Sequence, residues 1–143
     1  MRTGRAARGA ALAGAATALV AAAGCGGVQA ADLFLVTRDG PAPHERLTLL
    51  VNEEGGVTCN GQKAGRLDDP QIVEARAIQE DLKEPATAHL RLAPAPGSVV
   101  RYQVRDADGT VVFAENSRNQ PDVLRKLQLL VLQTSQRICH LAD

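Results

Sequence analysis

Apolar and polar residues alternate along the chain beyond residue 31 in a pattern that predicts an α+β domain. Runs with period-two alternation or β-branched residues are typical of strands, and glycine-containing turns separate them. The runs span residues 33–37, 46–52, 57–59, 100–105 and 110–114. Segments 53–56 and 106–109 carry glycine where tight hairpin turns need it. A short edge strand is also expected at residues 89–92.

Two further segments have apolar residues at helical spacing. In the first, Asp68 or Asp69 is expected to cap the helix, Pro70 suits its first turn, and Pro85 is expected to end it. The second helix is expected to begin at Pro121. Their apolar stripes are Ile72, Ala75, Ile78 and Leu82, and then Val123, Leu124, Leu127, Leu130, Val131, Thr134 and Ile138. Because each element has a single apolar side, we expect an antiparallel sheet of four to five strands with two helices packed on one face.

The N-terminal region has a different composition, which indicates an export signal. Three arginines stand within the first eight residues, and an uncharged, alanine-rich run follows over residues 9–31. A positive start, an apolar stretch and a small-residue exit are typical of secretory signals. We therefore expect residues 1–24 to be a signal peptide and residues 32–143 to form a single small domain.

The end of this signal contains a motif of its own. Ala22, Ala23 and Gly24 stand immediately before Cys25. This arrangement resembles the lipobox of bacterial lipoprotein precursors. The resemblance implies that Cys25 receives diacylglycerol on its sulfur, that residues 25–31 become a tether, and that a lipid anchor holds the protein at the extracytoplasmic face of the cell membrane.

Two other outcomes of export stay open from the sequence. Val28-Gln29-Ala30 also fits an ordinary signal peptidase, and cleavage after Ala30 would remove Cys25 and release a soluble secreted protein. Alternatively, the uncharged run would remain as an uncleaved anchor, since a bilayer is spanned by about 20 apolar residues.

The cysteines indicate a disulfide, and the charge balance limits the kinds of partner that the protein is expected to bind. With Cys25 acylated or removed, Cys59 and Cys139 remain, and outside the cytoplasm such a pair most simply forms one disulfide. Loss of the first three arginines leaves 13 of the 16 basic residues against 16 acidic ones. That acidic balance, with only three aromatic residues in the chain, argues against a nucleic-acid partner.

The sequence contains no constellation that points to catalysis. His44, His89 and His140 lack metal-ligand spacing, and Asp106–Gly109 has no acidic residue at the twelfth position of a calcium loop. We expect no enzyme activity, no cofactor and no metal. Leu129 and Leu132 lie opposite the main stripe of the last helix, and two exposed leucines on adjacent turns indicate a surface for a protein partner or for self-association.

The region after the signal resembles small exported proteins of actinobacteria that have no assigned activity. The likeness rests on Ala31-Asp32-Leu33-Phe34, Leu47–Asn52, Cys59-Asn60-Gly61, Arg101-Tyr102 with Asp108-Gly109-Thr110, and Cys139. The sequence thus favours a membrane-anchored, non-enzymatic binding or accessory domain. The alternative is a soluble secreted module of the protease-inhibitor kind, since small exported subtilisin inhibitors also combine a sheet with two helices. The oligomeric state is not indicated.

Overall fold

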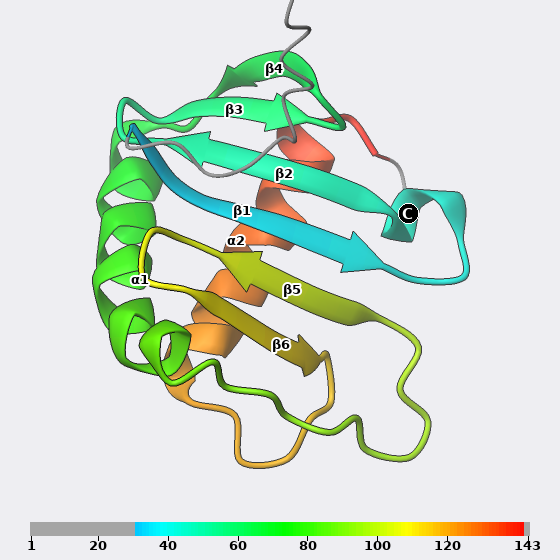
Figure 1. Cartoon of the computed structure of the whole chain (residues 1–143). Helices are drawn as coiled ribbons and strands as arrows, with labels where there is room; N and C mark the ends of the chain where they lie inside the picture. Colours follow the sequence, from blue (N-terminus) through cyan, green and yellow to red (C-terminus); the bar gives the residue numbers. More distant parts are fainter. Residues whose placement is uncertain (1–30, 142–143) are drawn as a thin grey trace, which may run out of the picture.

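Six strands form one antiparallel sheet, and two α-helices lie against one of its faces (Figure 1). The computed structural model describes residues 31–141. In order across the sheet the strands are β4 (Gln62–Arg66), β3 (Gly56–Cys59), β2 (Leu47–Asn52), β1 (Asp32–Asp39), β5 (Arg101–Arg105) and β6 (Thr110–Ala114). The two halves of the sheet meet at β1, which pairs with β2 on one side and β5 on the other.

The alternation of buried and exposed residues along the strands shows which face of the sheet the helices cover. In β1, Phe34 and Val36 are buried while Thr37 is exposed, and in β5 the burial alternates residue by residue. The buried positions pack with the helices into a single apolar core. The expected antiparallel sheet, two helices and one disulfide are therefore confirmed.

Hairpin turns form where the sequence predicts them. At the β2–β3 turn, the Asn52 side-chain oxygen accepts hydrogen bonds from the backbone N–H groups of Glu54 and Gly56, and Gly55 adopts a φ of 82°. At the β5–β6 turn, Asp106 Oδ1 accepts from the N–H groups of Asp108 and Gly109. In each turn a side-chain oxygen, from the Asn52 carboxamide or the Asp106 carboxylate, accepts the backbone N–H groups that a backbone carbonyl would otherwise accept.

Helix α1 (Asp69–Thr87) begins as expected but ends later. The Asp68 side chain accepts a hydrogen bond from the Gln71 N–H, and Gln71 reciprocates in a capping box. The prediction that Pro85 ends the helix is wrong, because the helix continues two residues further. Proline in the last turn removes one N–H, whereas Leu82 and Ala86 on the same face remain fully packed in the core.

Helix α2 (Asp122–Arg137) follows Pro121 and buries the expected apolar stripe except for Ile138, which lies just beyond the helix and is half-buried. Just beyond it, Cys139 forms the expected disulfide with Cys59 of β3, with a Cα–Cα distance of 5.8 Å. The bond joins the end of α2 to the β3–β4 side of the sheet. No helix within residues 31–141 has the length and apolar character needed to cross a bilayer.

The predicted number of strands, four to five, is too low. Strand β4 has five exposed residues, so it carries none of the apolar alternation that marks a strand; it exists because the Asn60-Gly61 turn returns the chain alongside β3. The strand expected at residues 89–92 is only a single parallel bridge between Arg91 and Val112. A short 3-10 turn, η1 (Pro43–Glu45), connects β1 to β2.

Candidate functional site

Among the described residues, those expected to carry function lie in two separate places. Cys25 falls outside the described residues, so its acylation stays a prediction. Cys59 and Cys139 are joined in the structural disulfide. Leu129 and Leu132 are 51% and 41% exposed on α2, as the stripe predicts. Leu132 also lines a pocket that the sequence did not indicate.

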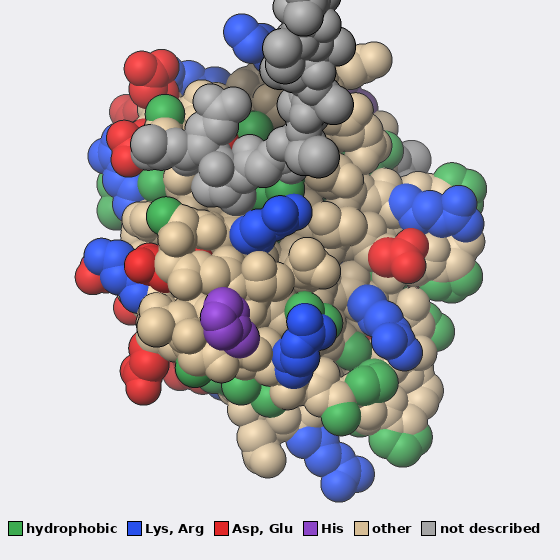
Figure 2. All heavy atoms as spheres, viewed as in Figure 1, with side chains coloured by type: hydrophobic (Ala, Val, Ile, Leu, Met, Phe, Trp, Pro, Cys, Tyr) green, Lys and Arg blue, Asp and Glu red, His purple; other side chains and the backbone are tan. Residues whose placement is uncertain are grey.

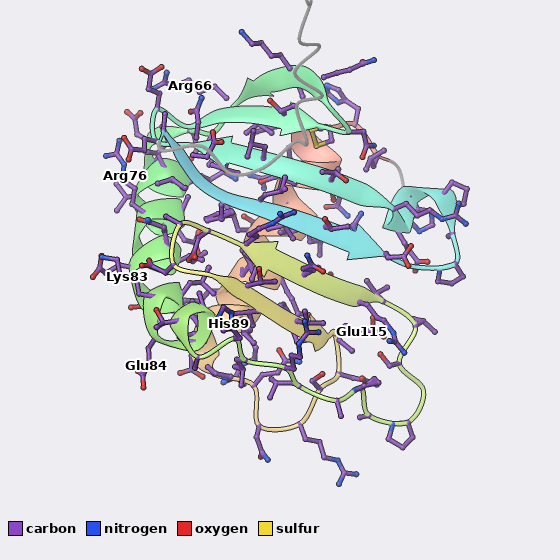
Figure 3. All side chains as sticks on the ribbon, in the orientation of Figure 1. Arg66, Arg76, Lys83, Glu84, His89 and Glu115 are labelled. Atoms are coloured by element: carbon purple, nitrogen blue, oxygen red, sulfur yellow. A yellow bond between two sulfur atoms is a disulfide. The ribbon has the colours of Figure 1, made fainter. Side chains whose placement is uncertain are left out.

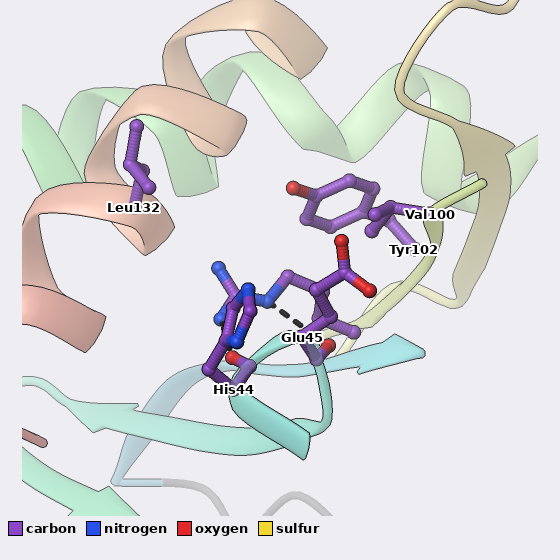
Figure 4. A pocket seen from close by; sticks show the side chains of 6 residues that line it. His44, Glu45, Val100, Tyr102 and Leu132 are labelled. Carbon is purple, nitrogen blue, oxygen red and sulfur yellow. Dashed lines mark hydrogen bonds between the residues drawn. The ribbon is translucent and has the colours of Figure 1, made fainter. Parts of the chain in front are cut away.

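This pocket, of about 190 Å³, opens between α2 and the corner where β1 turns into β2 (Figure 4). It lies at one end of the sheet, and Leu132 faces Tyr102 across it. Its lining combines side chains from β1, η1, β5 and α2: Arg38, His44, Glu45, Val100, Tyr102 and Leu132. We refer to it as the Arg38 pocket.

Arg38 is the unusual residue of this pocket. It follows Phe34 and Val36 on the covered face of β1 and is only 7% exposed. Its Nε donates to the Glu45 carbonyl at 3.2 Å and its Nη2 to the His44 carbonyl at 2.5 Å, which fixes η1 against the strand. Among the described residues, no carboxylate oxygen lies within 4 Å of the guanidinium.

A buried cation normally has a carboxylate partner, because carbonyl dipoles offset only part of its lost hydration. The Arg38 guanidinium contacts two carbonyl dipoles and lies at the opening of the pocket, but no carboxylate of the described residues is paired with it. Its guanidinium therefore offers a favourable site for an acceptor group that enters from outside.

Tyr102 lies beside Arg38, its direct partner in the β1–β5 register, and is the one tyrosine of the chain. Its ring stacks on Phe113 with centroids 5.2 Å apart, which holds the phenol in place. Burial raises the Tyr102 pKa above the usual value of 10.0, while the Arg38 charge and its hydrogen bond act in the opposite direction. The hydroxyl thus stays protonated at neutral pH and is available as a donor or acceptor.

Glu45 and His44 complete the polar part of the lining. Glu45 Oε2 accepts the Ala42 N–H at 2.8 Å, so this carboxylate closes the turn. His44, which lacks metal-ligand spacing in the sequence, is half-buried in the pocket wall. The polar groups of the lining are thus one guanidinium, one imidazole, one carboxylate and one phenol.

Arg38 is not among the residues that the sequence pattern singled out, although a signal for it exists. Strand period two places residue 38 on the same face as the apolar positions 34 and 36. A charged residue at an inward position of a strand is itself a reason to look for a site. The expected strand ended one residue earlier, which hid this position.

A second feature is the exposed loop before β5, held from outside by two side chains. Asn116 Oδ1 accepts the Ala95 N–H, and its Nδ2 donates to the Pro96 carbonyl at 3.3 Å. The Glu115 carboxylate accepts the N–H groups of Val99 and Val100 (Figure 3 labels Glu115 at the end of β6). The result is a proline-containing loop with a fixed backbone and an exposed Val99 (58%).

Metal-ligand geometry is also missing from the part of the chain that the structure covers. No group of three or more His, Cys, Asp or Glu side chains converges there. His89 and His140 are exposed, and Asp106 serves its turn through Oδ1.

Comparison with known proteins identifies no relative: no family model, no curated protein and no solved structure matches this chain.

Proposed function

We propose that this protein is a non-enzymatic binding module that a lipid on Cys25 anchors to the extracytoplasmic face of the bacterial cell membrane. The N-terminal signal with its lipobox-like end supports the anchor. The disulfide agrees with an oxidising compartment outside the cytoplasm. The pocket beside the exposed leucines supports the binding role.

One observation carries the binding role: a buried guanidinium without a carboxylate partner lies in a pocket lined by the exposed Leu132, and the exposed Leu129 is one turn earlier on α2. An acidic or amide side chain of a partner fits the Arg38 pocket, where Arg38 and Tyr102 supply polar contacts. An adjacent apolar residue of that partner would cover Leu129 and Leu132. An apolar area with a polar anchor is the usual composition of a protein-binding surface.

The test of this surface replaces both leucines and leaves the fold intact. The variant Leu129→Gln/Leu132→Gln is compared with Val73→Gln, which changes a 67% exposed apolar residue on α1. Detergent-solubilised envelope complexes are sized on native gels, and folding is checked by circular dichroism. We expect the leucine variant alone to lose the complex. A folded leucine variant with an unchanged complex would contradict the proposed surface.

The braced loop favours a second candidate function, the protease-inhibitor-like module of a soluble secreted form. Such inhibitors present a rigid convex loop to a protease cleft, and the Asn116 and Glu115 side chains stiffen the loop at Ala95–Val100. Inhibition assays against serine proteases, with wild type and Asn116→Ala, test this candidate. Loop-dependent inhibition would favour it, and no inhibition by wild type would remove it.

A further inference from the structure

The second face of the sheet has no covering layer within residues 31–141. Helix α2 passes behind the sheet in Figure 1, and α1, at the left of that view, packs into the same core. The outward residues of the central strands are exposed or half-buried, among them Leu35, Thr37, Leu50 and Gln103. We call this surface the open face.

The open face carries several basic side chains. Arg101 and Arg105 are the exposed positions that alternate with the buried Tyr102 and Val104 of β5. Arg91 bridges to β6 between Leu90 and Leu92, which pack on the core, so its side chain points the other way.

The strand register shows which residues of the open face are neighbours across all six strands. Directly paired residues share a face, and the pairings place a single row over all six strands: Lys63, Thr58, Leu50, Leu35, Arg105 and Thr110. The neighbouring row contains Thr37, Gln103, Val112 and Arg91. With strands about 4.8 Å apart and a rise of about 3.4 Å per residue, Arg91, Arg101 and Arg105 form a triangle with sides of about 12–14 Å.

Acidic residues are concentrated elsewhere. Helix α1 alone contains five acidic and two basic residues in Asp69–Thr87. The open face has two acidic residues on β1: Asp39, which is opposite Arg101 in the strand register, and Asp32 at the start of the strand. Figure 2 shows mostly Lys and Arg side chains over the sheet, with an acidic side chain among them, and both acidic and basic side chains along the α1 side. The domain is therefore electrically polarised, although it has a net negative charge.

The tether is long enough to let this face reach the membrane. From Cys25 to Ala31 an extended chain spans about 20 Å, and six strands span about 24 Å. The tether joins at β1, a central strand, so only about half of the sheet width separates its attachment point from either edge.

We propose that the open face rests on the anionic phospholipid surface of the membrane to which the chain is anchored. This inference rests on the proposed lipid anchor. The arginines supply the electrostatic attraction, while Leu35 and Leu50 add apolar contact between them. Leu129, Leu132 and the Arg38 pocket then face away from the bilayer, toward a partner.

The test uses the mature chain from residue 25 with Cys25→Ser, so that no acyl chain contributes to binding. Sedimentation with vesicles of pure phosphatidylcholine is compared with sedimentation with vesicles that also contain phosphatidylglycerol, whose negative surface charge attracts basic segments. We expect binding only to the anionic vesicles, and loss of binding in about 0.5 M salt, where screening shortens the Debye length to a few Å.

Two charge-matched triple variants assign the effect to the open face. The side chains of Arg91, Arg101 and Arg105 are exposed and form none of the ion pairs found in the described residues. Their replacement by glutamine is expected to weaken binding about fivefold per arginine, or about 100-fold together. The control variant changes Lys83, Lys126 and Arg137 of the helix layer to glutamine and should lose less than about threefold.

Several results would overturn the proposal. Equal binding to neutral and anionic vesicles would do so, as would an equal loss in the two triple variants. Binding to soluble polyglutamate but not to anionic vesicles would assign the face to an acidic polymer instead of lipid. An exported protein that carries an acyl chain yet shows no anionic preference contradicts this inference alone, whereas absence of the acyl chain contradicts the proposed function.

Discussion

Removal of the disulfide is the perturbation whose effect follows most directly from the structure. The double variant Cys59→Ser/Cys139→Ser cuts the link between β3 and the end of α2. Helix α2 keeps its own packing, because Leu124, Leu127 and Leu130 stay fully buried against the sheet. We therefore expect a folded but less stable domain.

The size of the loss comes from the length of chain that the bond closes. The two cysteines are 80 residues apart, and the chain-entropy relation gives about 4.5 kcal/mol at 25 °C for such a loop. Native disulfides usually contribute somewhat less, so the expected loss in unfolding free energy is about 2–4.5 kcal/mol. For a domain of this length the melting temperature should fall by roughly 8–18 °C.

The assay is urea unfolding followed by circular dichroism, with Cys59→Ala/Cys139→Ala as the matched control for any effect of the serine hydroxyls. Reduced wild type should unfold like the two variants. A change below about 1 kcal/mol in both variants would refute the reasoning, because the bond would then not restrict the unfolded chain.

Three further predictions concern single side chains. Asp68→Ala removes the α1 cap and should cost about 1 kcal/mol in urea unfolding, whereas Asp69→Ala, one residue later, should cost less. Gly109→Ala places a Cβ 2.2 Å from the Ala86 carbonyl oxygen and should lower the free energy of unfolding by about 2 kcal/mol or more. Its control, Gly97→Ala, places a Cβ in open space at a φ of +81° and should lower the free energy of unfolding by only about 1 kcal/mol. Equal losses in the two variants would contradict the close approach at Gly109. Because burial raises the Tyr102 pKa, tyrosinate absorbance should appear at a pH above the usual pKa of 10.0, and the free energy of unfolding should fall as the pH rises through that pKa. The variant Arg38→Gln should raise the Tyr102 pKa further, and an unchanged Tyr102 titration in this variant would exclude the Arg38 contact.

Much of the fold could be predicted because its signals are local. The Asp68 cap, the glycine turns and the α2 stripe each lie within a few residues of sequence. Strand β4 could not be found in this way, because an edge strand with no buried side chain has no periodicity. The end of α1 was misjudged because packing of Ala86 outweighs the proline one residue before it.

The candidate site was less predictable, for a physical reason. Leu129 and Leu132 could be identified from their position off the helical stripe. The Arg38 pocket depends on Arg38, η1 and Tyr102 meeting across β1 and β5, a pairing that no local pattern encodes. The open face likewise becomes visible only when the register of six strands is known.

Intact mass of the exported protein tests the central claim, that this domain works outside the cytoplasm on a lipid tether. The account predicts a chain that begins at Cys25, carries added acyl mass, and is lighter by two hydrogens because Cys59 and Cys139 are joined. A full-length chain recovered from the cytosol, with both of these thiols open to alkylation, would contradict it.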